Sequence, residues 1–378
     1  MLNRIPFNRP VLVGHELDYI QQAIRGQHAS GNGPFTKRVE ADLEQILGAP
    51  RILLTTSCTH ALEMSARLLD LAPGDEVIVP SLTFVTTAAA FALHGGTPVF
   101  VDVRPDTLNL DEQLLAAAIT PRTRAIVAVH YAGIGCSMEA ILEIASRRGI
   151  VVIEDNAHGL FGSWNGRPLG SFGALSTLSF HETKNVSCGE GGALVLNDAS
   201  FVPRAEILRE KGTNRAKFFR GEVDKYTWVD HGSSWVLSDL LAAYLLAQIE
   251  ERESIQARRR AIWTAYHTRL ETWAGQNGVR LPHLPAQAAP AWHIYALLLP
   301  NATSRSRVLR HLGQNGVNAT FHYQPLNLSP MGARFGGRAG QCPVAEDVAD
   351  RLVRLPMYND MRSEDVEAVI DAVTAFTA

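Results

Sequence analysis

The sequence has 378 residues, of which 46% are hydrophobic, and this is enough for one large domain with a buried core and a second, smaller domain. Lysine and arginine total 35 against 38 acidic residues, giving a formal net charge of -3. The chain therefore lacks the overall positive charge expected of a nucleic-acid-binding protein.

The cysteines and the apolar segments exclude further classes of protein. Cys58, Cys136, Cys188 and Cys342 are scattered and form no C-x-x-C pair, which disfavours a disulfide framework or a metal site. No segment approaches the roughly 20 apolar residues of a membrane span, and the first ten residues do not resemble a signal peptide. We expect a cytoplasmic protein that binds neither membrane nor metal.

The first half of the chain predicts an α/β fold. Two helices are expected over residues 16–25 and 36–47, separated by the Gly/Asn/Pro-rich residues 30–34. Short β-branched segments then alternate with helical ones, with strands at 51–56, 76–80, 97–103, 124–130 and 150–155 and helices at 60–69, 86–93, 111–118 and 138–148. This alternation is typical of βαβ units, so we expect a mainly parallel sheet covered by helices on both faces.

Residues 176–197 place a lysine at a bend between two strands. An apolar segment, 176–181, precedes Lys184, and glycines at 189, 191 and 192 lead into a second strand, 193–196. The chain has only five lysines, and Lys184 alone has this setting. Its ordinary interpretation is a solvated hairpin lysine. Apolar surroundings would instead disfavour its ammonium form and leave an amine able to attack a carbonyl.

The second half of the chain predicts a smaller α+β domain. A polar and aromatic loop region, 211–235, precedes one long helix expected over about 238–273. A proline-rich linker at 282–290, a strand at 291–299, a helix at 304–315, a strand-like segment at 318–326 and a closing helix at 364–376 follow. We expect a large domain over 1–245 and a small domain over 246–378, joined by the long helix.

Polar and aromatic side chains follow four of the predicted strands, where open α/β sheets bind ligands. Each has an ordinary alternative: the turn at Ser57 could be a plain helix cap, Phe84 a core residue, His158 a structural histidine, and Asp155 a metal ligand, a ribose contact or a cap. Together with Lys184 they match the requirements of pyridoxal phosphate. This cofactor needs N–H donors for its phosphate, an aromatic for its ring, a carboxylate for its ring nitrogen and a lysine for its aldehyde.

The sequence resembles the sugar-nucleotide aminotransferases of the DegT/DnrJ/EryC1/StrS family, which are pyridoxal-phosphate enzymes of the aspartate aminotransferase-like fold type I. The likeness covers essentially the whole chain, from GNGPFTKRVEADLEQ through LLTTSCTHALEM, VVIEDNAHG, SFHETKN and GEGGALVLND to VRLPMYND. It implies that Lys184 bonds the cofactor aldehyde and that Asp155 pairs with the ring nitrogen. It also implies ring stacking by Phe84, and phosphate contacts at Ser57, Cys58, Thr59 and Ser179.

Three positions depart from the family pattern. Cys58 stands where the family usually has glycine, and His158 where it usually has glutamine, so His158 is expected to touch the ring face or the 3-hydroxyl region. Ser234 stands where most members carry an asparagine that reaches the phosphate of the neighbouring subunit. We therefore expect a homodimer with shared active sites, in which this contact is weakened or bridged by water.

Within the family, the segments VDVRPDTLNLDE, VHYAG, FHETKN, EKGTNRAKFFRGEVDKYTW and FHYQPL resemble the branch that makes dTDP-4-amino-4,6-dideoxygalactose for enterobacterial common antigen. This resemblance implies transfer of the amino group of L-glutamate to C4 of a dTDP-4-keto-6-deoxy sugar. His322, Tyr323 and the 211–235 segment are candidates for substrate contact, with ordinary packing as the alternative. The galacto or gluco configuration of the product stays open.

Three other functions remain as alternatives. One is a 3-aminotransferase or 3-dehydrase on a related sugar nucleotide, although relatives that dehydrate carry histidine at the position of Lys184. Another is a non-catalytic regulator on the same fold, which would need neither Lys184 nor Asp155. A nucleotide-dependent oxidoreductase is the third, and the chain lacks the G-x-G-x-x-G turn after its first strand.

Overall fold

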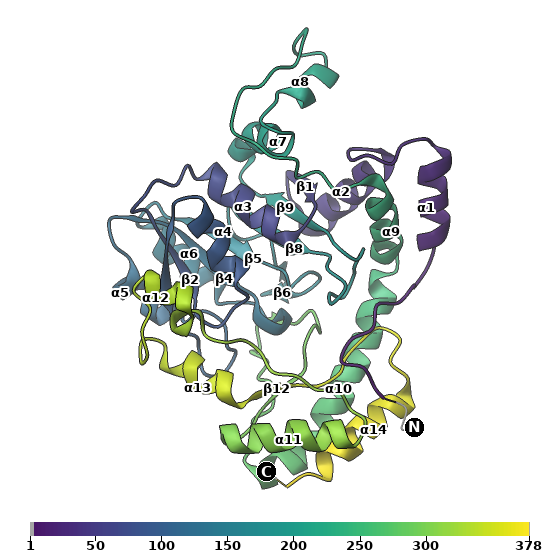
Figure 1. Cartoon of the computed structure of the whole chain (residues 1–378), viewed down its shortest axis with the longest axis vertical. Helices are drawn as coiled ribbons and strands as arrows, with labels where there is room; N and C mark the ends of the chain where they lie inside the picture. Colours follow the sequence, from purple (N-terminus) through teal and green to yellow (C-terminus); the bar gives the residue numbers. More distant parts are fainter. Residues whose placement is uncertain (1–3, 378) are drawn as a thin grey trace.

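A seven-stranded sheet forms the centre of the computed structural model, which describes residues 4–377 (Figure 1). Its strand order is β1-β9-β8-β5-β4-β2-β3. The strands are β1 (Arg51–Thr55), β2 (Glu76–Pro80), β3 (Thr97–Val101), β4 (Thr123–Val129), β5 (Val151–Asp155), β8 (Leu175–Ser179) and β9 (Gly192–Leu196). Only β9 is antiparallel to its neighbours, so the other six strands end at one edge. The predicted α/β class is confirmed.

Helices cover both faces of this sheet because successive strand residues point to opposite sides. Leu53 and Leu194 pack with α3 (Cys58–Leu68), α4 (Thr86–Leu93) and α7 (Val202–Arg209) on one face. Ile52 and Val195 pack with α2 (Pro34–Leu47) and α9 (Asp239–Glu250) on the other. That second face is continued by α6 (Met138–Ser146) beneath β4 and β5. The two outer helices α1 (Glu16–Arg25) and α5 (Leu115–Ala118) complete the layers.

A second hydrophobic core lies at the other end of the molecule. It is built from α10 (Arg252–Asn277), α11 (Ala302–Gln314) and α14 (Ser363–Thr374), and it includes Ile5 from the N-terminal segment. The two-stranded sheet of β11 (Ala296–Leu298) and β12 (Leu352–Arg354) contributes to it. Shorter elements are β6 (Ser163–Trp164), β7 (Arg167–Pro168), β10 (Ala288–Ala289), α12 (Pro330–Arg334) and α13 (Pro343–Arg351). The domain boundary after residue 245 stays a prediction.

The single long helix expected over 238–273 is wrong. The chain forms two helices, α9 and α10, which meet at Glu251, where φ is -90° and ψ is 11°. No proline or glycine marks the break, since residues 250–254 read EERES. The break instead separates two environments, because α9 packs against the large sheet and α10 runs through the second core.

Two predicted strands of the second half are also largely absent. Of residues 291–299 only Ala296–Leu298 is a strand, because Trp292 takes a left-handed φ of 54° and the carbonyl of Ala291 accepts a hydrogen bond from the Asn185 side chain at 2.6 Å. Residues 318–326 contribute only an isolated bridge between Thr320 and Arg354. Both segments instead run past the edge of the large sheet.

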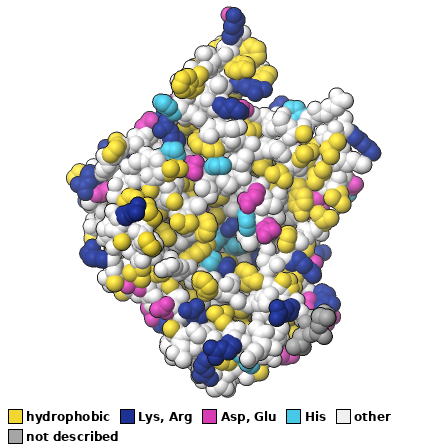
Figure 2. All heavy atoms as spheres, in the orientation of Figure 1, with side chains coloured by type: hydrophobic (Ala, Val, Ile, Leu, Met, Phe, Trp, Pro, Cys, Tyr) yellow, Lys and Arg dark blue, Asp and Glu magenta, His cyan; other side chains and the backbone are white. Residues whose placement is uncertain are grey.

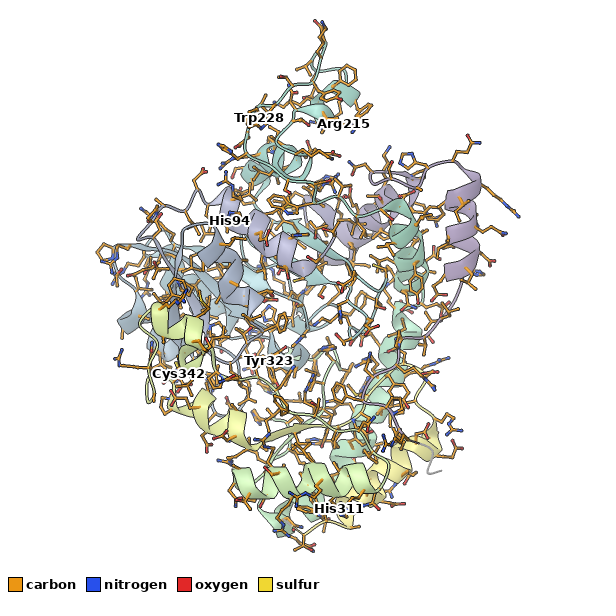
Figure 3. All side chains as sticks on the ribbon, in the orientation of Figure 1. His94, Arg215, Trp228, His311, Tyr323 and Cys342 are labelled. Carbon is orange, nitrogen blue, oxygen red and sulfur yellow. The ribbon has the colours of Figure 1, made fainter. Side chains whose placement is uncertain are left out.

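The predicted loop region 211–235 projects from the rest of the chain, at the top of Figure 1. It contains the short helix α8 (Arg215–Phe219), and exposed hydrophobic side chains gather on it (Figure 2). Trp228 is 71% accessible (Figure 3), whereas Trp235 at the end of the segment is buried. Separately, none of the helices within residues 4–377 is long and apolar enough to cross a membrane.

Candidate active site

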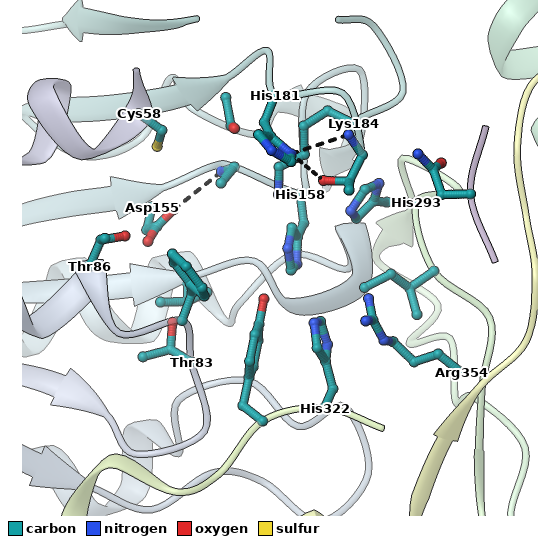
Figure 4. A pocket seen from close by; sticks show the side chains of 18 of the residues that line it. Cys58, Thr83, Thr86, Asp155, His158, His181, Lys184, His293, His322 and Arg354 are labelled. Atoms are coloured by element: carbon teal, nitrogen blue, oxygen red, sulfur yellow. Dashed lines mark hydrogen bonds between the residues drawn. The ribbon is translucent and has the colours of Figure 1, made fainter. Parts of the chain in front are cut away.

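A cavity of about 500 Å³ opens where β5 and β8 end, between the large sheet and the second core (Figure 4). It gathers every predicted site residue except Ser234: its lining includes Ser57, Cys58, Thr59, Phe84, Asp155, His158, Ser179, Lys184, His322 and Tyr323. These residues come from segments far apart in the sequence, and the parallel strand arrangement brings most of them to one edge. The specific role of each residue stays a prediction.

Lys184 lies in the hairpin that joins β8 to β9. The hairpin is closed by backbone hydrogen bonds from Phe180 to Gly191 at 2.8 Å and from Glu182 to Gly189 at 2.9 Å. Gly189 has a φ of 85°, a left-handed conformation that favours glycine. The Lys184 side chain is half-buried, and burial lowers its pKa from 10.5 to about 8. A much larger fraction of this amine is therefore neutral, and able to attack a carbonyl, than for a solvated lysine.

Asp155 is the last residue of β5, and hydrogen bonds fix its carboxylate at the cavity wall. Its side chain is buried, and Oδ2 accepts a hydrogen bond from Oγ1 of Thr87 at 2.7 Å. The Thr87 hydroxyl is itself bonded to that of Thr83 at 2.9 Å. Oδ1 accepts from the backbone N–H of Ala157 at 3.3 Å (Figure 4). The carboxylate is therefore held in one orientation toward the cavity.

The Ser57 turn opens α3 beside these two residues. Ser57 is the N-cap, and its Oγ accepts a hydrogen bond from the backbone N–H of His60 at 3.1 Å. The remaining free N–H groups of the first turn make this helix end suited to an anion. Gly192 of β9 allows the turn to approach closely, since a Cβ there would lie 2.3 Å from the Cys58 nitrogen.

Cys58 itself faces the cavity, with its Sγ 3.6 Å from Oγ1 of Thr177. Burial, with a smaller contribution from Asp155, raises the pKa of the Cys58 thiol to about 12. The thiol therefore stays neutral and adds no negative charge where the phosphate is expected. A cysteine at this position, where the family usually has glycine, is therefore compatible with an anion site.

Aromatic and imidazole rings form the opposite wall. Nδ1 of His322 is hydrogen-bonded to the hydroxyl of Tyr131 at 3.1 Å, and the ring of Phe84 lies 6.1 Å from that of Tyr323. His158 lies 4.6 Å from the ring of His293. Burial, followed by the charge of Lys184, lowers the pKa of His158 well below its ordinary value, so its ring is uncharged. Nδ1 of His158 has no hydrogen-bond partner among residues 4–377 and is free to bond a ligand.

Several lining residues escaped the sequence analysis: Phe7, Asn8, Thr83, Thr86, His293 and Arg354. Arg354 lies within VRLPMYND, a segment that carried the family resemblance, so a signal was present. His293 was hidden inside the predicted strand 291–299. Phe7 and Asn8 precede the first helix and carry no motif that would indicate a site.

A buried arginine ties the lysine hairpin to the second core. Arg259 of α10 is 2% exposed and donates to the carbonyls of Trp292 at 2.9 Å and His293 at 2.7 Å. It also donates to Oδ1 of Asn359 at 3.0 Å, and Asn359 donates to the carbonyl of Asn185 at 2.9 Å. Asn185 follows the lysine directly. Arg259 thus fixes the hairpin and His293 relative to each other.

Ser234 lies outside the cavity. It is exposed at the base of the projecting segment, where its backbone forms an isolated bridge with Glu210. The sequence analysis assigned it to the site of a neighbouring subunit. That role concerns a second copy and stays a prediction.

Comparison with known proteins agrees with the fold. Residues 11–374 match the sequence pattern of the DegT/DnrJ/EryC1/StrS aminotransferase family. The chain is 32% identical over 377 residues to the spore coat polysaccharide biosynthesis protein SpsC of Bacillus subtilis, covering 98% of this chain and 96% of that protein. Its structure is similar to the aminotransferase TlmJ from Streptoalloteichus hindustanus, with a TM-score of 0.90, 33% identity and 98% of both chains covered.

A further solved structure is the pyridoxal-phosphate form of the sugar aminotransferase Spr1654 from Streptococcus pneumoniae. It has a TM-score of 0.90 and 26% identity, and 98% of both chains is covered. The protein is thus a pyridoxal-phosphate-dependent transaminase of fold type I. It belongs to the DegT/DnrJ/EryC1/StrS aminotransferase family and is a sugar aminotransferase.

The donor set of the cavity fits this cofactor. A lysine with a lowered pKa suits the aldehyde, a buried carboxylate suits a protonated ring nitrogen, and the start of α3 suits a phosphate. The unpartnered Nδ1 of His158 offers one more polar contact. The residues present therefore match each of the polar groups that pyridoxal phosphate carries.

Proposed function

We propose that this protein transfers the amino group of L-glutamate to C4 of dTDP-4-keto-6-deoxyglucose, giving dTDP-4-amino-4,6-dideoxygalactose. The observation that carries the proposal is that Lys184 and Asp155 line one cavity with His322 and Tyr323, which belong to FHYQPL. That segment is among those that resemble the branch acting on this sugar nucleotide. The sugar-aminotransferase family supports the reaction class.

In this proposal, each of the site residues has a defined task. Bound pyridoxal phosphate supplies an electron sink that lets an amino group leave one carbon and join another. Lys184 would hold the cofactor at its aldehyde and would move the proton at Cα of the amino donor as a general base. Asp155 holds a proton on the ring nitrogen, and Ser57, Thr59 and Ser179 bind the phosphate.

The second half-reaction, in which the sugar receives the amino group, uses the same residues with the proton moving in the opposite direction. Lys184 returns a proton to the carbon that receives the amino group, C4 of the sugar. His322 and Tyr323 orient the sugar from the opposite wall, where their rings lie stacked with centroids 3.5 Å apart. Because their pKa shifts keep His322 and Tyr323 uncharged near neutral pH, they contact hydroxyls as hydrogen-bonding groups rather than as ions.

Product analysis tests this function. With dTDP-4-keto-6-deoxyglucose and L-glutamate, we expect one 2-oxoglutarate per amino sugar formed, and an NMR spectrum with the amine at C4 in the galacto configuration. An amine at C3, or the gluco epimer, would contradict the proposal. If L-glutamate alone converts the bound cofactor but this sugar nucleotide is not aminated, the transaminase class stands and the named substrate is wrong.

We also propose that the active unit is a homodimer with shared sites. Ser234 and the projecting 211–235 segment contribute to the partner's cavity in this arrangement, since both lie away from the cavity of their own chain. Sedimentation velocity should give twice the chain mass of 41.3 kDa at the concentrations used for assays. A fully active species with the mass of one chain would contradict shared sites.

A further inference from the structure

His293 is a buried histidine in the wall of the cavity, and none of the assigned roles uses it. It lies in the irregular segment before β11, where its carbonyl accepts a hydrogen bond from Arg259 at 2.7 Å. Its ring lies 4.6 Å from that of His158. Figure 4 shows the ring on the side of the cavity that carries Lys184. The backbone of His293 is thus held in place beside the reacting lysine.

The side chain of Asn185 determines which nitrogen of the His293 ring carries the proton. Its amide nitrogen donates to the carbonyl of Ala291 at 2.6 Å, so its oxygen must be the atom that faces His293. That oxygen lies 2.8 Å from Nδ1 of His293. An amide oxygen can only accept a hydrogen bond, so Nδ1 must be the protonated nitrogen.

The ring of His293 is uncharged. Burial, followed by the charge of Lys184, lowers its pKa well below the ordinary value, and Arg259 and Arg354 act in the same direction. A neutral imidazole has one donor and one acceptor. Because Nδ1 is the donor, Nε2 is an acceptor with its lone pair free.

This acceptor has no hydrogen-bond partner within residues 4–377. Buried polar groups in folded proteins are normally hydrogen-bonded, and a site that leaves one unpaired is waiting for a ligand group of the opposite kind. Since His293 lines the cavity, a molecule bound there can supply the missing partner. That partner must be a hydrogen-bond donor.

The chemistry of the three molecules that use the cavity separates them. The phosphate and the ring oxygen of pyridoxal phosphate are acceptors, and its ring nitrogen is already assigned to Asp155. The carboxylates of L-glutamate are acceptors too, and its ammonium group must lose its proton before it can react. The sugar carries hydroxyl groups, which can donate. Of the two carbons next to C4, C3 carries a hydroxyl, whereas C5 carries the ring oxygen and a methyl group.

We propose that Nε2 of His293 accepts a hydrogen bond from the C3 hydroxyl of the sugar, and that the enzyme thereby selects keto sugars with a hydroxyl beside the reacting carbon. This proposal rests on the proposed function, because it takes a 4-keto sugar nucleotide as the amino acceptor. Asn185 is a positioning residue in it, since it fixes the tautomer. The residue after Lys184 thus connects the reacting amine to sugar recognition.

The test compares two sugars, dTDP-4-keto-6-deoxyglucose and its 3-deoxy analogue, in the sugar half-reaction. The reaction starts from protein whose cofactor already carries the amino group and is followed by cofactor absorbance. In the wild type, we expect kcat/KM for the 3-deoxy analogue to be about 10-fold or more below that for the full substrate, because Nε2 is left unpaired. Equal kcat/KM values for the two sugars would overturn the proposal.

Two substitutions of His293 divide the ring into its two nitrogens. Asparagine places an amide nitrogen near the position of Nδ1, so His293→Asn can keep the bond to Asn185 while losing the acceptor. Its preference for the full substrate should fall to about 2-fold or less. Glutamine places an oxygen near the position of Nε2, so His293→Gln should recover part of the preference. This double comparison of residue and hydroxyl isolates their interaction from general damage to the site.

The donor half-reaction is the readout that separates this role from others. With L-glutamate, kcat/KM of His293→Asn should stay within about 2-fold of the wild type. A loss with L-glutamate as large as the loss with the sugar would assign Nε2 to Lys184 or to the donor's ammonium group, and would overturn the proposal. His283→Asn is the matched control, because His283 is exposed and lies outside the cavity. It should leave both half-reactions and the sugar preference unchanged.

The proposed function and this proposal fail in different ways. If the wild type does not aminate dTDP-4-keto-6-deoxyglucose, the named substrate is wrong and the C3 assignment falls with it. If the wild type aminates both sugars equally well, the proposed function stands and only the role of His293 is wrong. A preference for the C3 hydroxyl that survives unchanged in His293→Asn would also assign that hydroxyl to another residue.

Discussion

Replacing Lys184 with alanine should abolish turnover and leave the cofactor loosely held. Lys184 is the only lysine among the described residues that line the cavity, so no other amine there can take its place. Loss of the general base and of the covalent attachment removes both contributions of this residue, and general base catalysis alone typically contributes about 10²- to 10⁴-fold. Activity should be assayed with L-glutamate and the sugar nucleotide, and retention of the cofactor by dialysis.

The Lys37→Ala variant is the matched control, because Lys37 is exposed on α2 and lies outside the cavity. It should keep wild-type activity.

A second readout uses pH. Since the pKa of Lys184 is lowered to about 8, its neutral amine becomes dominant above pH 8, and cofactor uptake by the apo protein should accelerate as pH rises through this value. Near-wild-type turnover in Lys184→Ala would show that the lysine is misassigned.

Replacing Asp155 with asparagine should lower kcat by about 10²- to 10³-fold, the usual effect of removing one preorganised electrostatic contact. Asparagine has nearly the same shape and can still accept the hydrogen bond from Thr87, so the loss reports the negative charge rather than packing. The carboxylate favours the protonated ring nitrogen, and the neutral amide does not. The measurement is single-turnover kinetics with L-glutamate on the cofactor-loaded protein.

Thr87→Val provides a graded comparison with the Asp155 variant. It removes one hydrogen bond to Oδ2 and leaves the charge in place, so it should cost much less than Asp155→Asn. Equal losses in the two variants would mean that orientation, not charge, is the contribution of Asp155. Wild-type rates in Asp155→Asn would remove it from the proposed mechanism.

The large sheet and its polar edge could be predicted from sequence because their signals are local. Most of the parallel strands are short apolar segments; Ser57 lies just after β1, Asp155 ends β5, and Lys184 lies in the hairpin that follows β8. Parallel strands bring their carboxyl ends together whatever the exact strand order. Placing these residues around one cavity therefore required only the fold class and their positions relative to the strands.

The opposite wall could not be predicted in the same way. Arg354 lies at the end of a short strand, and His293 lies in an irregular segment. The positions of both residues depend on packing between the large sheet and the second core. The helix break at Glu251 has no local signal, because residues 250–254 are all compatible with a continuous helix. Such features follow from long-range burial, which periodicity does not report.

The reversed direction of β9 has a mechanical consequence. Because β8 and β9 are neighbours joined by one hairpin, Lys184 is anchored to the same sheet as Asp155, whereas Arg354 lies between Val353 and Leu355 of the second core. The spacing of Lys184 and Asp155 is therefore set within one sheet, whereas the gap between Lys184 and Arg354 is set across the two cores, through the bonds of Arg259 and Asn359 to the lysine hairpin. The two groups expected to hold the cofactor thus keep their spacing through the hydrogen bonds of the sheet itself.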